Sequence, residues 1–226
     1  MNFQDELKAK TDGRLYMYYQ SKIITGTFSY LQGHDDKNIE GLFSIAIDLF
    51  NALGSWIYGG ISPKIVYPVL QLFVKKSNAS TAESFSHLLG YINWNSKNLY
   101  KILENNQWIE EPCYENYTLK KSNDVTTGLF FMWRLGRLIV EMTDISNEKD
   151  IPIPKHVQNA LNDLFDAFGN WIYHQEGIVS VTQSLQRFEK LFGEEFDPLY
   201  DGILEEIIDT RKNISKFLQN LSGKLS

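Results

Sequence analysis

Hydrophobic residues recur along most of the chain at steps of three and four positions, with polar residues between them. This spacing places apolar side chains on one face of an α-helix. In residues 3–31, for example, Leu15, Tyr19 and Ile23 follow one another at four-residue steps. Strand signals are sparse, because no Asn-Gly or Asp-Gly turn lies between alternating apolar runs. The pattern predicts an all-α protein.

The same periodicity and its interruptions predict about eight helices. A Ser80–Glu83 capping box marks one helix start, and Pro68 is expected to kink or restart the helix around it. Pro154 marks another start, because proline suits the beginning of a helix. The expected helices of the first half cover residues 3–31, 39–58, 63–76 and 80–105. In the second half, a fifth helix is expected to start near residue 123, a sixth after Pro154, and the last two to cover residues 178–192 and 197–221.

A shift of 115 positions aligns the two halves of the chain without a gap. Residues 49–58, LFNALGSWIY, fall on residues 164–173, LFDAFGNWIY. Over residues 11–105 matched with 126–220, 25 of 95 positions are identical, whereas about six would match by chance at ordinary composition. The match favours an internal duplication.

The predicted fold is therefore a tandem duplication of a four-helix unit. Residues 1–110 form the first repeat unit, 111–122 form a linker packed on the body, and 123–226 form the second unit. Units of this size are normal domains. We expect a pseudo-twofold arrangement of the two units, as in duplicated homodimers.

Composition narrows the class of protein. Among 226 residues, 43% are hydrophobic and 14% aromatic, which argues against a disordered chain. The net charge of −6 disfavours a nucleic-acid partner. The single cysteine, Cys113, excludes an intramolecular disulfide and a cysteine-based zinc site.

Two segments of the sequence bear on where in the cell the protein is found: its first residues and its most apolar stretch. The first residues are polar and acidic, so no secretory signal is expected and the predicted location is cytoplasmic. Residues 41–63 are apolar enough to raise the question of a membrane span. Asp48, Asn51 and several glycines within them favour a buried helix and its turn instead.

Common catalytic and cofactor-binding motifs are absent from the sequence. The sequence has no phosphate-binding loop, dinucleotide-binding motif, HExxH motif or GxSxG motif. His34-Asp35-Asp36 offers possible metal ligands, but a polar turn between helices explains it better. We therefore predict no catalytic residues, no metal and no cofactor.

Repeated aromatic residues are the sharpest candidates for a binding site. Trp56 and Tyr58 recur as Trp171 and Tyr173, and His174 follows directly. Aromatic side chains at a helix end either line a pocket or anchor an interface, or else belong to the core. His174 is either an acid or base at a cleft or a helix-end histidine near the last carbonyls.

Charged residues form a second group of candidates. Asp48 and Asp163 are equivalent under the shift, and they either share a proton at an interface or hydrogen-bond a neighbouring helix. Arg134 either binds an anionic ligand or pairs with Asp163. An acidic run over residues 189–209 either attracts a basic partner or forms a solvated helix face.

Three functions follow, in order of preference. The first is a non-enzymatic protein-interaction module, for example a neutralising or inhibitory partner of a basic protein. The second is a carrier or sensor of a small apolar ligand held in a helical-bundle cavity. The third is an enzyme of unrecognised type.

Overall fold

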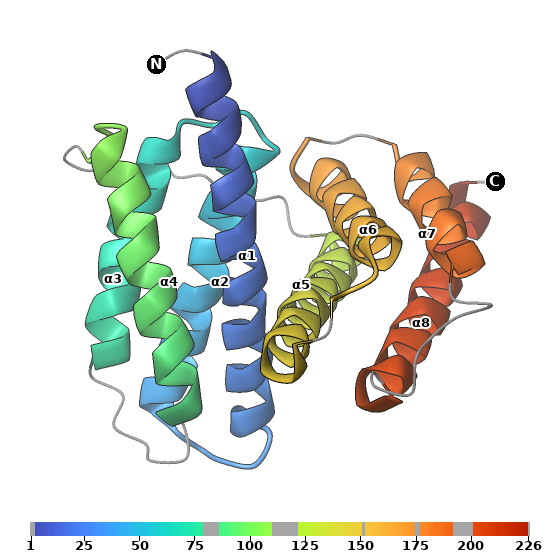
Figure 1. The fold of residues 1–226 in the computed structure, drawn as a ribbon, viewed down its shortest axis with the longest axis horizontal. Coiled ribbons are helices and arrows are strands. Elements are labelled where there is room, and N and C mark those ends of the chain that lie inside the picture. Colours follow the sequence, from blue (N-terminus) through green and yellow to red (C-terminus); the bar gives the residue numbers. More distant parts are fainter. Residues whose placement is uncertain are drawn as a thin grey trace. The chain divides into compact units, whose positions relative to one another are not determined.

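The structure is a computed structural model, and it describes residues 3–78, 86–109, 122–150, 152–174, 177–191 and 201–225. Within these ranges it consists of eight α-helices and one short 3₁₀-helix, with no strand (Figure 1). The all-α class is confirmed. The chain separates into two compact units, Met1–Leu119 and Lys120–Ser226.

Unit 1 is a closed ring of four helices. Helix α1 packs against α2 and α4, and α3 packs against the same two helices. Successive helices run in opposite directions (Figure 1), as in an up-down bundle. The elements of unit 1 are α1 (Phe3–Leu31), α2 (Lys37–Ile57), η1 (Pro63–Ile65), α3 (Val66–Asn78) and α4 (Ser86–Asn105).

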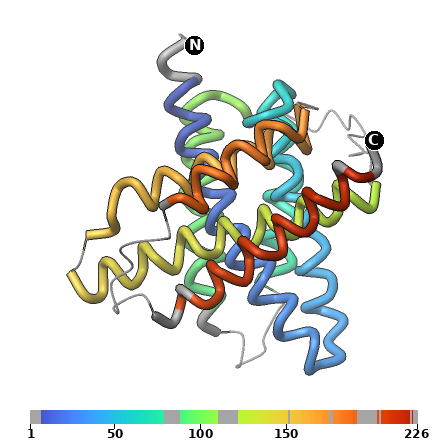
Figure 2. Tube along the Cα trace, turned by 90° about the vertical axis from the view of Figure 1, so that its right-hand side faces the viewer, coloured from blue at the N-terminus to red at the C-terminus, as the bar shows by residue number. Residues whose placement is uncertain are grey.

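Unit 2 has the same order of contacts. Helix α5 packs against α6 and α8, and α7 packs against the same two helices. Figure 2 shows α5 and α8 crossing in yellow-green and red. The elements are α5 (Asn123–Lys149), α6 (Lys155–Tyr173), α7 (Val179–Leu191) and α8 (Asp201–Leu225).

Helix ends follow from capping chemistry. Asp36 accepts hydrogen bonds from the N–H groups of Asn38 and Ile39, so α2 begins two residues before the predicted start. Pro68 is the third residue of α3, which begins directly after the 3₁₀-helix. Proline is tolerated in this first turn, because its missing N–H removes no hydrogen bond there. Ser122 caps α5 in the same way as Asp36 caps α2.

Two predicted features lie outside the described residues. These are the capping box at residues 80–83 and the start of the last helix near residue 197. The predicted linker, 111–122, also lies there except for Ser122, which caps α5. None of the helices in the described ranges has the length and hydropathy needed to cross a membrane.

In each unit a tryptophan ring lies against a glycine: Trp56 in the core of unit 1 and the half-buried Trp171 in unit 2. Trp56 is 2% exposed, and its ring lies so close to Gly13 that a Cβ atom there would sit 2.7 Å away. Gly128 and Trp171, exactly 115 positions later, meet in the same way in unit 2. Glycine at both positions lets the first helix of the unit approach the second closely.

Candidate functional site

A group of aromatic side chains lies along the contact between α1 and α4. The Trp94 ring lies 4.4 Å from that of Tyr19 and 5.9 Å from that of Tyr16, and the rings of Tyr19 and Tyr91 are 6.0 Å apart. We call these four residues the aromatic patch. Trp94 is 42% exposed, and Tyr19 and Tyr91 are half-buried. Trp94 is therefore the member of the patch that presents the largest part of its side chain to solvent, and Tyr16 and Tyr19 pack beside it.

Lys22 holds one edge of the aromatic patch. Its Nζ donates a hydrogen bond of 2.9 Å to the Tyr91 hydroxyl and lies 4.3 Å from the centre of that ring. This distance allows a cation–π interaction. Leu15, one helical turn before Tyr19, is also 42% exposed and extends the apolar surface along α1.

Buried polar residues beneath the aromatic patch fix the register of α4 on α1. Asn95 donates a hydrogen bond of 3.0 Å to the Gln20 side chain, which in turn donates one of 3.1 Å to the Ala46 carbonyl of α2. Both amides are almost fully buried. A buried amide that loses its hydrogen-bond partner is costly. These two hydrogen bonds therefore favour one alignment of α1, α2 and α4.

Tyr16 is the buried member of the aromatic patch. Burial raises the pKa of the Tyr16 hydroxyl above its ordinary value of 10.0, and the nearby Asp12 carboxylate and Tyr19 add to the shift. Burial acts in this direction because it penalises the charged phenolate.

Unit 2 uses the same positions for ion pairs. Arg134 pairs with Asp209 at 3.1 Å and with Glu206 at 3.5 Å, and Arg137 also pairs with Glu206. These residues lie 115 positions after Tyr19, Trp94, Tyr91 and Lys22. One helix contact is therefore lined by aromatic rings in unit 1 and by opposite charges in unit 2.

The partners of Arg134 differ from the sequence prediction. Of the two alternatives drawn from the sequence, an anionic ligand or a pair with Asp163, the pair with Asp163 does not form: Arg134 pairs with α8, and Asp163 is exposed on α6. The prediction was wrong because the sequence does not reveal which face of α8 lies against α5. Asp48 is likewise exposed on α2, so neither aspartate is a buried acid.

The repeated aromatic residues divide between core and surface. Trp56 and Tyr173 are buried, whereas Tyr58 and Trp171 are half-buried. Trp171 packs beside Phe168 and Phe217, with ring centres 6.2 and 5.9 Å away. The structure does not bring these residues into the aromatic patch.

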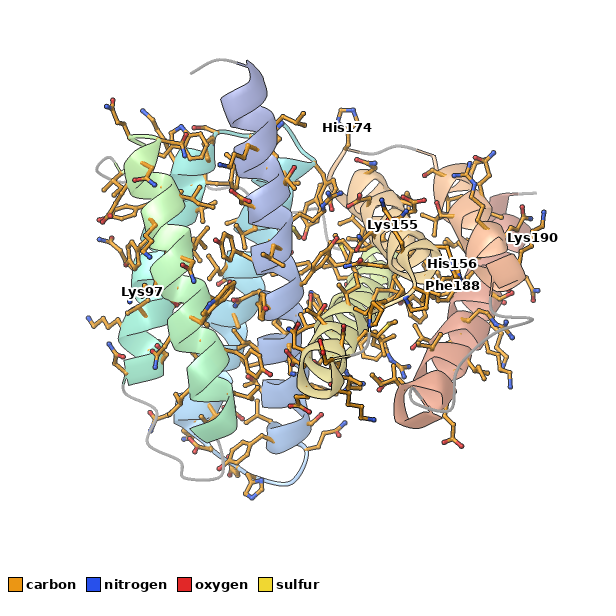
Figure 3. The ribbon with its side chains drawn as sticks, in the orientation of Figure 1. Lys97, Lys155, His156, His174, Phe188 and Lys190 are labelled. Atoms are coloured by element: carbon orange, nitrogen blue, oxygen red, sulfur yellow. The ribbon has the colours of Figure 1, made fainter. Side chains whose placement is uncertain are left out.

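His174 is the C-cap of α6 and is exposed. Figure 3 shows its side chain pointing away from the helices. Its backbone N–H donates to the Asn170 carbonyl, as expected for a helix-end residue.

The histidine turn between α1 and α2 is a structural connection. His34 lies 2.9 Å from the Tyr30 carbonyl through Nδ1, and its ring stacks on the Tyr30 ring at 4.2 Å. Asp36 is occupied as the N-cap of α2. Within the part of the chain that the structure describes, no three histidine, cysteine or acidic side chains are grouped to hold a metal ion.

The residues of the aromatic patch were not among the sites predicted from the sequence. The signal was present in the 115-residue alignment, where Tyr19, Tyr91 and Trp94 stand opposite Arg134, Glu206 and Asp209. An aromatic trio that matches a charged trio marks a helix contact whose chemistry differs between the two units.

Comparisons with protein-family models, curated proteins and solved structures find no match to this chain.

Proposed function

We propose that the chain is a non-enzymatic protein-interaction module and that its partner docks on the aromatic patch. The observation that carries this proposal is the exposure of Trp94, whose ring packs at a tilt against Tyr19, at a position where unit 2 has Asp209. Tryptophan and tyrosine are enriched among the few residues that supply most of the energy of protein interfaces.

Helix packing alone does not require these rings. Unit 2 joins the matching helices with Arg134, Glu206 and Asp209, so the contact tolerates charged residues at the same positions. A large aromatic side chain that is left partly in water gains little for the fold. Its exposure is better explained by a partner that covers it.

The partner's charge is a separate part of the proposal. A net charge of −6 favours a basic partner through long-range attraction. Glu206 and Asp209, however, already pair with arginines of the same unit, which reduces the free acidic surface of the run over residues 189–209. Binding that weakens steeply with salt would support a basic partner, and salt-independent binding would contradict it.

We also propose that the two units arose by duplication. Support comes from the matching helix order, the two glycine–tryptophan contacts and the position-by-position match of the α1–α4 and α5–α8 contacts. On this view the aromatic patch is a specialisation of unit 1. The pseudo-twofold arrangement stays a prediction.

Affinity capture from the native host with matched variants tests the proposed function. Trp94→Asp replaces the tryptophan with the residue that unit 2 has at the matched position. Leu72→Asp is the control, because Leu72 is 47% exposed on α3, away from the aromatic patch. We expect a protein that the wild type and Leu72→Asp retain alike and that Trp94→Asp loses by about tenfold or more. Equal retention by Trp94→Asp would contradict the proposal.

A further inference from the structure

A hollow at one end of unit 1 is separate from the aromatic patch. It has a volume of about 260 Å³, and its walls come from the start of α1, the end of α2, the following loop and the residues after α4. We call it the indole pocket, because two tryptophans line it. Its lining residues are Lys10, Trp56, Ile61, Ser62, Pro63 and Trp108, together with Gly60.

Two unusual backbone conformations shape the indole pocket. Gly60 has a φ of 66° and Gln107 a φ of 57°, both in the left-handed region. Gln107 and Trp108 donate hydrogen bonds to the carbonyls of Glu104 and Leu103, which closes α4 with a Schellman turn. Glutamine is less suited than glycine to the left-handed position, so the contacts of the next residue, Trp108, must help to hold this turn.

Those contacts join the two indoles. The Trp108 ring meets the Trp56 ring edge to face, at 5.3 Å and 71°. Both residues are at most 9% exposed, so the pair forms a fixed wall. Edge-to-face and offset contacts with such rings favour an aromatic ligand.

The polar side of the indole pocket selects the charge of a ligand. Apart from the indoles, Lys10 and Ser62 are the two lining residues with polar side chains, an ammonium and a hydroxyl. An ammonium has three N–H donors, so a ligand carboxylate can bind in addition to the interaction that Lys10 has within the chain. A cationic ligand would instead be repelled.

Size and position complete the assignment. The volume lies just below the ~300–1,000 Å³ of pockets for drug-sized ligands, which suits one aromatic ring with a short acidic chain. Unit 2 has Val125 and Gly223 at the positions 115 residues after Lys10 and Trp108, so neither the cation nor the second indole is part of the shared helix pattern.

We infer that the indole pocket of unit 1 binds a small aromatic carboxylate, with the ring against Trp108 and Trp56 and the carboxylate on Lys10. The indole pocket and its ligand are distinct from the aromatic patch and the protein partner proposed for it.

Side-chain NMR of the full chain labelled with ¹⁵N at tryptophan tests the inference, with phenylacetate as the probe. The five indole N–H signals are assigned with single Trp→Phe variants at positions 94, 108, 133 and 171, which leaves Trp56 by elimination. We expect saturable shifts of Trp56 and Trp108 at phenylacetate concentrations up to about 10 mM. Absence of these shifts, or equal shifts of all five signals, would overturn the inference.

Matched ligands and variants test separately the aromatic wall of the indole pocket and its cation, Lys10. Phenethylamine reverses the charge of the probe and cyclohexylacetate removes its aromaticity, and both should bind at least about fivefold more weakly. Lys10→Gln should weaken phenylacetate binding to the same extent, Lys10→Arg should largely restore it, and Lys8→Gln, an exposed neighbour, should leave it unchanged. Equal affinities across these variants would refute the role of Lys10.

Discussion

At the scale of single residues, similar sequence positions have different surroundings. Trp56 and Trp171 occupy matched positions, yet Trp56 is almost fully buried while Trp171 is half-buried. Trp94 is more exposed than either. The sequence identified the repeated tryptophans as important but could not separate core from surface, because burial depends on which helices cover them.

The three tryptophans should therefore differ in their contribution to stability. Trp56→Ala should lower the free energy of unfolding by about 3–5 kcal/mol, because it leaves a large cavity in the core. Trp171→Ala should cost less, and Trp94→Ala should cost about 1 kcal/mol or less. Urea denaturation measures all three. A Trp56→Ala variant as stable as the wild type would contradict the assignment of Trp56 to the core.

Glycine positions make an independent prediction. Gly13→Ala places a methyl group against the Trp56 ring, and this overpacking should destabilise unit 1 by about 1–3 kcal/mol. Gly90→Ala is the control, since a Cβ atom at Gly90 on α4 meets nothing within 4 Å. That change should stabilise the helix by roughly 0.5–1 kcal/mol. The opposite order of stabilities in thermal unfolding would contradict the packing described for α1.

At the scale of helices, periodicity predicted their existence well and their mutual contacts poorly. The range 3–31 coincides with α1, because amphipathic spacing is a local property. The contacts Tyr19–Trp94 and Arg134–Asp209 each join residues 75 positions apart, and they depend on the register of two helices. Local spacing contains no information on that register, so the aromatic patch was not predicted.

The α1–α4 contact should weaken in alkaline solution. The raised pKa of Tyr16 means that the folded state keeps its phenol proton above pH 10.0, where the unfolded chain releases it. Stability from this group is therefore complete below pH 10.0 and falls as the pH rises further. Denaturation between pH 9 and 11, about one unit either side of the ordinary tyrosine pKa, measures the effect. Tyr16→Phe should make the free energy of unfolding fall less steeply with pH. An unchanged slope in this variant would contradict the assignment of the effect to Tyr16.

The α5–α8 contact should respond to salt instead. Glu206 pairs with both Arg134 and Arg137, and all three side chains are partly exposed. Glu206→Gln should lower the free energy of unfolding by about 1 kcal/mol at low ionic strength. The loss should be smaller in about 1 M NaCl, because salt screens partly exposed ion pairs. A loss that does not change with salt would show that packing, not charge, joins these helices. Tyr91→Phe, at the matched position of unit 1, should show no such salt dependence.

At the scale of the whole molecule, each unit has its own ring of four helices and its own buried core. The division into two units was expected from the repeat. Distinct roles for the units were not, because the matched positions point to a common fold, whereas the aromatic patch and the ion pairs stand at positions where the two units differ.

Photo-crosslinking in the native host tests the central claim most directly. A benzoylphenylalanine residue replaces Leu15, which borders the aromatic patch, or Leu72, which lies on α3 and has similar exposure. We predict one discrete protein adduct from position 15 that Trp94→Asp abolishes, and no such adduct from position 72. An adduct formed equally from both positions, or one that persists in Trp94→Asp, would contradict the account.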